Sequence, residues 1–200
     1  KKKEKMLEKQ YLEECLSYTA STGIFTWKER PLHHFKSTRW QKAWNMRFAG
    51  LVTGCRDSRG HLQIKVDGIK YAAHRLAFIM MLGECPDYID HIDQDKTNNS
   101  FNNLRACTTS QNQANVSGKK GVYPTRNGKW RAQICKDYKI KHIGSFDTEE
   151  EAMRAYQSKH VELFGEFSVY ACTVRYIEPL HEDLTAYASL MGECAAKVRG

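Results

Sequence analysis

The sequence predicts an α+β protein in two parts, and three observations support this prediction. Residues 62–71 alternate between apolar and polar side chains around an Asp-Gly pair, which is typical of a β-hairpin. Residues 73–82 predict a helix that ends at Gly83. Residues 121–168 predict a small three-stranded antiparallel sheet with one packed helix, because three short strand patterns precede a capped helical pattern.

The composition is that of a folded, soluble protein. The chain has 200 residues, enough for one domain or two small ones, of which 41% are hydrophobic and 27% charged. It has no apolar run of about 18 residues, and its basic start is followed by charged residues, so we expect neither a membrane span nor a signal peptide. The seven cysteines lie far apart and form no C-x-x-C pair, so we expect a reducing cytoplasm and no thiolate zinc site.

The net charge of +8 points to a polyanionic partner, and its distribution is uneven. Acidic residues gather in one short region: Glu84, Asp87, Asp90, Asp93 and Asp95. Basic residues gather further on: Lys119, Lys120, Arg126, Lys129, Arg131, Lys136, Lys139 and Lys141. An acidic region on a basic protein suits a cation site beside a phosphate-binding surface.

The first elements are read from periodicity. Residues 4–18 predict a helix, because its apolar residues recur on one helical face: Leu7, Tyr11, Cys15 and Tyr18. A strand is expected at residues 24–27, after the break at Ser21-Thr22-Gly23. Residues 28–48 are basic and aromatic without a clear period, so we expect an irregular segment there.

A second hairpin follows the helix at 73–82. Residues 88–92 predict a strand, residues 93–103 a polar loop, and residues 104–108 a short return strand. Thr109 or Ser110 then caps a short helix that runs through Val116.

Residues 117–120 are small, flexible and charged, and we interpret them as a linker. The strands expected beyond it span residues 121–124, 129–135 and 139–146, and the helix spans residues 148–164. This helix starts with the capping-box spacing of Thr148 and Glu151. Residues 169–200 form a C-terminal extension to which we assign no role.

Four polar side chains around the second hairpin suit phosphodiester hydrolysis: Asp90, His91, Asn103 and Asn112. An imidazole can take a proton near neutral pH, whereas carboxylate and amide oxygens are hard ligands that suit Mg²⁺ or Mn²⁺. Neighbouring residues on a strand point to opposite faces, so a bend or bulge would be needed for Asp90 and His91 to act at one point. His74, on the helix at 73–82, is interpreted as a structural histidine.

The order of these motifs over residues 12–116 resembles the HNH endonuclease family, especially its phage and intron-encoded members. The motifs are Thr22-Gly23-Ile24-Phe25-Thr26-Trp27, the first hairpin, Ala73-His74-Arg75-Leu76, Asp90-His91-Ile92-Asp93, Asn103-Leu104-Arg105 and Gln111-Asn112. The resemblance implies an HNH domain at residues 1–116 whose ββα-metal core spans about residues 86–116. It implies that Asp90 and Asn112 hold one divalent cation (Mg²⁺ or Mn²⁺), that His91 is the general base, and that Asn103 pins the loop and orients His91. Asn112 in the third motif position marks the H-N-N variant, and the missing C-x-x-C pairs imply no structural zinc.

Residues 121–168 resemble the DNA-binding domain of plant APETALA/ethylene-response factors. The resemblance lies in Gly121-Val122-Tyr123, the run from Gly128 to Ile134, the run from Ile143 to Thr148, and Ala155-Tyr156. Strand alternation places Trp130, Ala132 and Ile134 under the helix and leaves the opposite face for DNA. The DNA-binding residues we expect are Tyr123, Arg126, Lys129, Arg131, Gln133, Lys139, Lys141 and His142.

With the HNH resemblance, these patterns imply a metal-dependent DNA endonuclease that nicks or cuts duplex DNA. A homing-type nuclease from a phage or mobile element is the expected role, and a restriction or packaging role stays open. We expect a monomer or weak homodimer in the cytoplasm of a bacterial host. Two alternatives remain open: a non-catalytic, sequence-specific DNA-binding regulator, and a metal-stabilised interaction module that binds no nucleic acid.

Overall fold

In the computed structural model, residues 8–118 and 121–171 are described, and they form two compact units that divide between Ala106 and Cys107. Each unit encloses its own cluster of buried apolar side chains. The division falls ahead of the predicted linker at 117–120, because helix α4 (Thr109–Ala114) packs with the second unit: Cys107 and Ala114 belong to its core. Most of the predicted extension at 169–200 lies outside the described residues.

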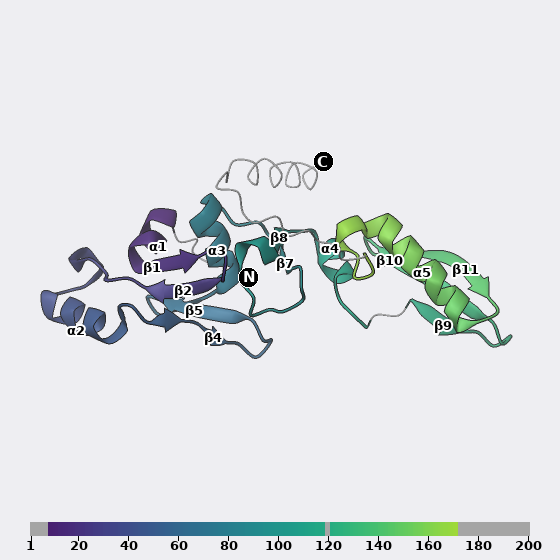
Figure 1. Ribbon diagram of the computed structural model, residues 1–200, viewed down its shortest axis with the longest axis horizontal. Helices are drawn as coiled ribbons and strands as arrows, with labels where there is room; N and C mark the ends of the chain where they lie inside the picture. The colour runs from purple at the N-terminus through teal and green to yellow at the C-terminus, as the bar shows by residue number, and fades with distance from the viewer. Residues whose placement is uncertain (1–7, 119–120, 172–200) are drawn as a thin grey trace. The chain divides into compact units, whose positions relative to one another are not determined.

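The first unit contains small antiparallel sheets and helices (Figure 1). One sheet has the order β1-β2-β3, a second β4-β5-β6, and a third is the hairpin β7-β8. Its strands are β1 (Leu16–Thr19), β2 (Ile24–Trp27), β3 (Val52–Thr53), β4 (Cys55–Arg56), β5 (Leu62–Val66), β6 (Ile69–Ala72), β7 (Ile89–His91) and β8 (Leu104–Ala106). Its helices are α1 (Lys9–Cys15), η1 (Leu32–His34), α2 (Thr38–Phe48), α3 (Ala73–Leu82) and η2 (Phe101–Asn103).

The predicted helix at residues 4–18 is wrong at its end. Helix α1 stops at Cys15, and residues 16–19 form strand β1. Tyr18 pairs with Phe25 of β2, and their ring centroids lie 4.6 Å apart. Backbone pairing with β2 therefore prevails over the helical spacing of the apolar residues.

The expectation of an irregular segment at residues 28–48 is also wrong, because residues 38–48 form helix α2. Its docked face is aromatic: the Trp44 ring lies 5.1 Å from that of Trp27 and 5.2 Å from that of Phe48. None of its residues is fully buried, so the apolar stripe that reveals an amphipathic helix in a sequence is absent here.

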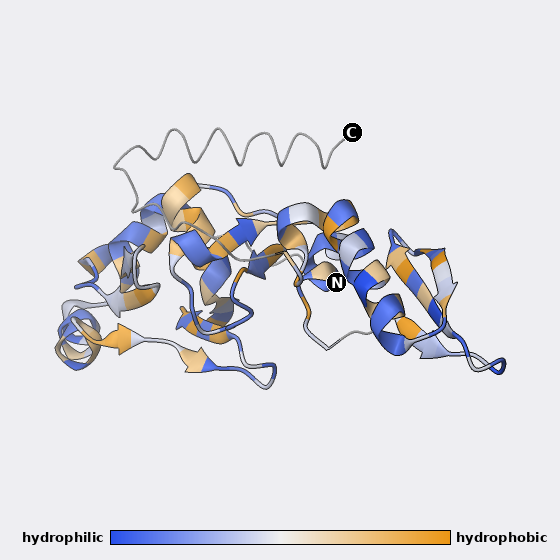
Figure 2. Cartoon of the chain, turned by 45° about the vertical axis from the view of Figure 1, so that its right-hand side comes forward, coloured by the Kyte–Doolittle hydropathy of each residue, from blue (hydrophilic) through white to orange (hydrophobic). Residues whose placement is uncertain are grey.

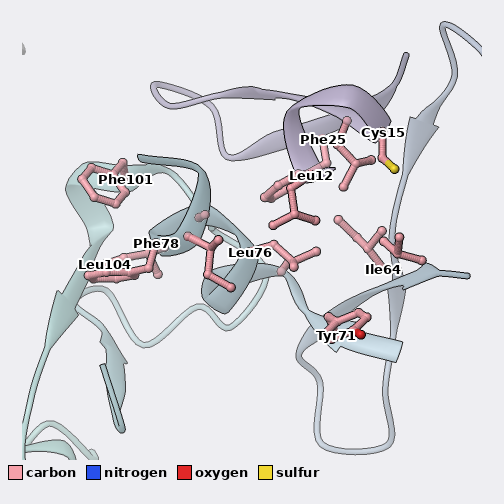
Figure 3. Packing of buried hydrophobic residues seen from close by; sticks show 14 residues of the cluster. Leu12, Cys15, Phe25, Ile64, Tyr71, Leu76, Phe78, Phe101 and Leu104 are labelled. Atoms are coloured by element: carbon pink, nitrogen blue, oxygen red, sulfur yellow. The ribbon is translucent and has the colours of Figure 1, made fainter. Parts of the chain in front are cut away.

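The core of the first unit gathers around α3. Figure 3 shows Leu76 of α3 facing Leu12 and Ile64, with Phe78 turned toward Phe101 and Leu104. The rings of Phe78 and Phe101 lie 5.4 Å apart, so the loop before β8 is anchored in the same core as α3. The hairpin β5–β6 confirms the sequence prediction, with Asp67 and Gly68 at positive φ in its turn.

The second unit is a three-stranded antiparallel sheet with helix α5 packed against it. Its elements are α4, β9 (Val122–Pro124), β10 (Trp130–Lys136), β11 (Lys139–Phe146), α5 (Glu149–Phe164) and η3 (Gly165–Phe167). The capping box of Thr148 and Glu151 is confirmed, whereas α4 is capped by Thr108 rather than by Thr109 or Ser110. In Figure 2 the strands of this sheet carry both orange and blue segments, as expected of a sheet with one buried face.

The alternation along β10 follows the prediction. Ala132 and Ile134 are buried in the core with α5, whereas Arg131 is exposed and Gln133 is half-buried. One face of this sheet is therefore left open to solvent and carries Arg131. The register places Lys139 and Lys141 opposite Lys136 and Ile134, on the side of the sheet that faces α5. Within the two described ranges, no helix combines the length and apolarity needed to span a bilayer.

The turn between β1 and β2 depends on a glycine. Gly23 has a φ of +73°, and a Cβ there would lie 2.2 Å from the carbonyl carbon of Asn99. We expect Gly23→Ala to lower the free energy of unfolding by about 2–5 kcal/mol, since it adds a steric clash to the left-handed backbone cost. Urea denaturation measures this change.

Gly50→Ala is the matched control, since Gly50 has a φ of +79° with nothing within 4 Å of its added Cβ. This variant should lose only the backbone contribution of about 1–2 kcal/mol. An equal loss of unfolding free energy in the two variants would show that the close contact between the turn and Asn99 does not contribute to stability.

Candidate functional site

The hairpin β7–β8 places two of the candidate side chains. Asp90 pairs with Arg105 and His91 pairs with Leu104 in the antiparallel register. Asp90 and His91 are only 5% and 6% exposed, so both polar side chains are removed from solvent. They contact different partners, as alternation along a strand requires.

Asp90 forms a buried ion pair with the residue directly opposite. The Nη2 and Nε atoms of Arg105 donate to Oδ2 of Asp90 at 2.7 and 2.9 Å. Arg105 is itself only 7% exposed. Because a buried carboxylate without a partner is costly, this guanidinium both stabilises Asp90 and sets its orientation.

Asn103 holds the loop that joins the two strands. Its Nδ2 donates to Oδ1 of Asp93 at 2.8 Å and to the carbonyl of Asn98 at 2.9 Å. Its Oδ1 accepts from the amide of Asp93 at 3.0 Å. Asn98 in turn donates to the other carboxylate oxygen of Asp93 at 2.6 Å. These reciprocal bonds close the loop on itself beside His91.

The imidazole of His91 has a neighbour that the sequence did not single out. Its Nε2 lies 3.3 Å from Oδ1 of Asn99. The Nδ2 of Asn99 donates to the carbonyl of Thr97, so Oδ1 is the atom that faces the ring and Nε2 acts as the donor. In this tautomer the lone pair of the neutral ring is on Nδ1. Burial lowers the pKa of His91, which favours the neutral ring.

Two further histidines crowd His91. The ring centroids of His74 and His61 lie 5.2 and 6.0 Å from that of His91. Burial lowers the pKa of His61 and takes that of His74 to about 3. Burial is the main cause of the low pKa of His74, and the neighbouring His91 and His61 lower it further. Within the described residues, Nδ1 of His74 is buried without a hydrogen-bond partner.

Sequence reasoning missed Asn99 and His61. Asn99 belongs to the predicted polar loop at residues 93–103, yet it is 1% exposed and its carbonyl accepts from the Tyr18 hydroxyl at 2.7 Å. His61 comes from the start of the β5–β6 hairpin, far from His91 in the sequence. No local pattern marks either residue, because long-range packing brings both to His91.

Asn112 lies on α4, which belongs to the second unit. Its side chain is half-buried, and its amide donates to the carbonyl of Thr108 at 2.9 Å. The structure thus gathers Asp90, His91 and Asn103 in the first unit and holds Asn112 in the second.

The candidate DNA-binding residues occupy the sheet of the second unit. Most are exposed: Tyr123, Arg126, Lys129, Arg131, Lys139, Lys141 and His142. The register places Arg131 beside Tyr123, and Gln133 beside His142. Lys129 also forms an exposed ion pair with Asp147 at 3.1 Å.

A separate His/Glu cluster has ligand atoms close enough for a metal ion. Nε2 of His33 and Nε2 of His34 lie 2.9 and 2.7 Å from Oε2 of Glu14. However, Nε of Arg30 donates to Nδ1 of His34 at 3.0 Å, so Nε2 of a neutral His34 carries the proton. A metal needs that nitrogen's lone pair, and the hydrogen bonds already satisfy the cluster.

The ion pair across the hairpin can be tested by its contribution to folding. We expect Arg105→Leu to lower the free energy of unfolding by about 3–5 kcal/mol, because it leaves Asp90 buried and unpaired. Urea denaturation in a chelator-containing buffer measures the loss without any bound cation. The double variant Asp90→Leu/Arg105→Leu should recover part of the lost stability, because it removes the unpaired carboxylate. A double variant as unstable as Arg105→Leu would show that the ion pair does not contribute to folding.

His74 should make stability depend on pH. Its pKa in the folded state is about 3, below the ordinary value of 6.5, so protons bind the unfolded state more readily. The contribution of His74 to the free energy of unfolding is therefore complete above pH 6.5 and is lost as the pH falls from there toward 3. Between about pH 7.5 and about pH 5.5 the expected loss is about 1 kcal/mol from this group. In His74→Leu the free energy of unfolding, measured by urea denaturation at the two pH values, should fall correspondingly less. An equal fall in the variant and the wild type would show that His74 is not the group responsible.

Comparison with known proteins relates this region to nucleases. Residues 71–114, from β6 through α4, match the model of the HNH endonuclease family. A protein of Acanthamoeba polyphaga mimivirus named "Uncharacterized HNH endonuclease L560" is 37% identical over 105 residues, which cover 50% of this chain and 56% of that protein. No solved structure matches the chain significantly. The chain is thus similar to HNH endonucleases over the segment that carries Asp90, His91, Asn103 and Asn112.

Proposed function

We propose that this chain is a metal-dependent endonuclease that hydrolyses phosphodiester bonds in duplex DNA. One observation carries the proposal: a buried imidazole, His91, follows a buried carboxylate, Asp90, on a hairpin within the segment that matches HNH endonucleases. Phosphodiester hydrolysis needs a proton acceptor for water and counter-charge for the phosphate, and these two groups suit those tasks. The mimivirus relative supports a viral or mobile-element origin, and we propose a homing-type role.

His91 is the proposed general base. With Nε2 donating to Asn99, Nδ1 would take a proton from the attacking water. The resulting hydroxide attacks phosphorus, and the bond from phosphorus to the leaving oxygen breaks. The rings of His61 and His74 pack beside His91 and restrict its motion, so the base is positioned before DNA binds.

Asp90 and Asn112 are the proposed ligands of a divalent cation. A carboxylate and an amide oxygen are hard donors, so the set fits Mg²⁺ or Mn²⁺ better than a softer metal. When bound, such a cation would supply counter-charge for the phosphate and for the leaving oxygen. Arg105 holds the Asp90 carboxylate in place on the hairpin.

Asn103 is proposed as a positioning residue. Its three bonds to Asp93 and Asn98 close the loop that also contains Asn99, the partner of His91. Loss of these bonds would free the loop and with it the orientation of the base.

The second unit is proposed to bind duplex DNA through its open sheet face, as in the APETALA/ethylene-response-factor domain that it resembles. Arg131 of this face and the exposed Arg126 and Lys129 of the β9–β10 turn can meet phosphates, while Tyr123, Gln133 and His142 lie on neighbouring positions of the same face that could contact bases. Lys139 and Lys141, exposed on the other side of β11, are proposed to reach phosphates from the edge of the sheet. The same surface favours the alternative function, a non-catalytic DNA-binding regulator.

A supercoiled-plasmid assay with Mg²⁺ or Mn²⁺ tests the proposed activity. We expect the wild-type chain to convert the plasmid to nicked or linear DNA and His91→Ala to lower the rate by about 10²–10⁴-fold, because the proton acceptor is lost. Asp90→Ala and Asn112→Ala should also lose activity. His33→Ala and Gln113→Ala are matched controls that change an exposed histidine and the exposed neighbour of Asn112.

Wild-type cleavage no faster than that of His91→Ala would overturn the proposal. Tight, salt-sensitive binding without strand breaks, unchanged in Asp90→Ala, would support the regulator instead. The ratio of nicked to linear product reports how many active sites act at once, and one site per chain predicts nicking by a monomer.

A further inference from the structure

Helix α2 lies in a part of the chain that has no acidic residue. No Asp or Glu occurs between Glu29 and Asp57, whereas the same stretch contains six basic residues: Arg30, Lys36, Arg39, Lys42, Arg47 and Arg56. Arg30 is buried and pairs with Asp67, so its charge is balanced inside the protein. The positive charge that this stretch presents to solvent comes from the other five basic residues. They are all exposed.

One face of α2 is committed to the protein. Gln41 and Asn45 donate to the carbonyl of Arg30 at 3.1 and 3.0 Å, and Asn45 accepts from the amide of Arg30 at 3.0 Å. Trp44 packs on the same side against Trp27. Positions 41, 44, 45 and 48 are spaced as one helical face, so the orientation of α2 about its own axis is set.

The opposite face is basic and faces solvent. Arg39, Lys42 and Met46 recur at i, i+3 and i+7, with Arg47 beside them, and we call these four residues the α2 outer face. Met46 is 89% exposed, and Trp40 on the flank is 67% exposed. Within residues 8–118 and 121–171, no carboxylate pairs with Arg39, Lys42 or Arg47. These three cations therefore lack a counter-charge within the described residues. An anionic partner that binds this face would provide the counter-charge.

A membrane surface and a nucleic acid both attract such a helix, and the packing decides between them. Interfacial membrane helices bury a broad apolar face in lipid. The apolar residues Trp44 and Phe48 of α2 instead pack against each other and, through Trp44, against Trp27, which leaves single exposed side chains on the basic side. Exposed cations on a helix whose apolar side chains are already packed are better suited to the phosphate groups of a DNA strand than to lipid.

We infer that the α2 outer face is a second DNA-binding surface, located in the first unit and separate from the basic sheet of the second. Arg39, Lys42 and Arg47 would contact the phosphate backbone of duplex DNA. The inference rests on the proposed endonuclease function for its partner, but it concerns binding alone.

The test is the salt dependence of DNA binding by the full chain, measured by fluorescence anisotropy on a labelled duplex with EDTA present so that no strand is cut. The triple variant Arg39→Ala/Lys42→Ala/Arg47→Ala should lower the slope of log K against log salt by about 2–3, one unit or slightly less per lost phosphate contact. Its Kd near physiological salt should rise roughly tenfold to hundredfold.

A matched control removes the same charge elsewhere. Lys9→Ala/Lys28→Ala/Lys159→Ala changes three lysines that already bond a carboxylate or a carbonyl, and its slope should stay within about one unit of the wild type. The variant Arg39→Lys/Arg47→Lys keeps the charge and should keep the slope. Circular dichroism of each variant checks that α2 remains folded.

Trp40 provides a readout that does not depend on affinity. DNA held against α2 should change the fluorescence of this exposed indole, and Trp40→Phe should remove that change while binding persists. An unaltered slope in the triple variant, or binding of the wild type to anionic vesicles in preference to DNA, would overturn the inference. Because cleavage plays no part in these measurements, a failure of the proposed endonuclease activity would be seen separately in the plasmid assay.

Discussion

The candidate site depends on how the loop between β7 and β8 is anchored to the β1–β2 turn. The amide of Phe101 donates to the carbonyl of Ala20 at 2.8 Å, and the hydroxyl of Tyr18 donates to the carbonyl of Asn99 at 2.7 Å. Gly23 lets the two backbones approach closely, and the Phe101 ring is fully buried against Phe78. These contacts fix Asn99, and Asn99 in turn contacts His91. The environment of the imidazole is therefore determined in part by Tyr18, Ala20 and Gly23, which lie 68 to 73 positions before His91 in the chain.

Around this anchor the first unit buries several polar side chains. Asp90, Arg105, His91 and Asn103 are all 9% exposed or less. Each finds a hydrogen-bond partner, as buried polar groups must. Nδ1 of His74 is the exception within the described residues, and burial without compensation explains its low pKa.

Charge is separated in a way that suits a polyanionic substrate. Positive residues are exposed on α2 in the first unit and on the β9–β11 sheet in the second, whereas Asp90 is buried and paired. The sheet is fixed by its apolar face, which packs against α5. Helix α2 is fixed by the hydrogen bonds of Gln41 and Asn45 to the Arg30 backbone. The positive potential of the two surfaces favours contact with polyanions, whereas the charge of Asp90 is balanced by Arg105 inside the hairpin.

The sequence by itself determined the elements whose rules are local. The turn at Asp67-Gly68, the end of α3 at Gly83, the capping box of α5 and the alternation along β10 were all predicted, because each depends on residues within a few positions of one another. The order of the Asp90, His91, Asn103 and Asn112 motifs also pointed to the matched nuclease family.

Only the tertiary structure decided the rest. It ended α1 at Cys15 by pairing residues 16–19 with β2, and it formed α2 by docking an aromatic face on Trp27 and the Arg30 backbone. It also brought His61, His74 and Asn99 to His91. In each case the deciding free energy comes from contacts between residues far apart in the sequence, which no local pattern of side chains records.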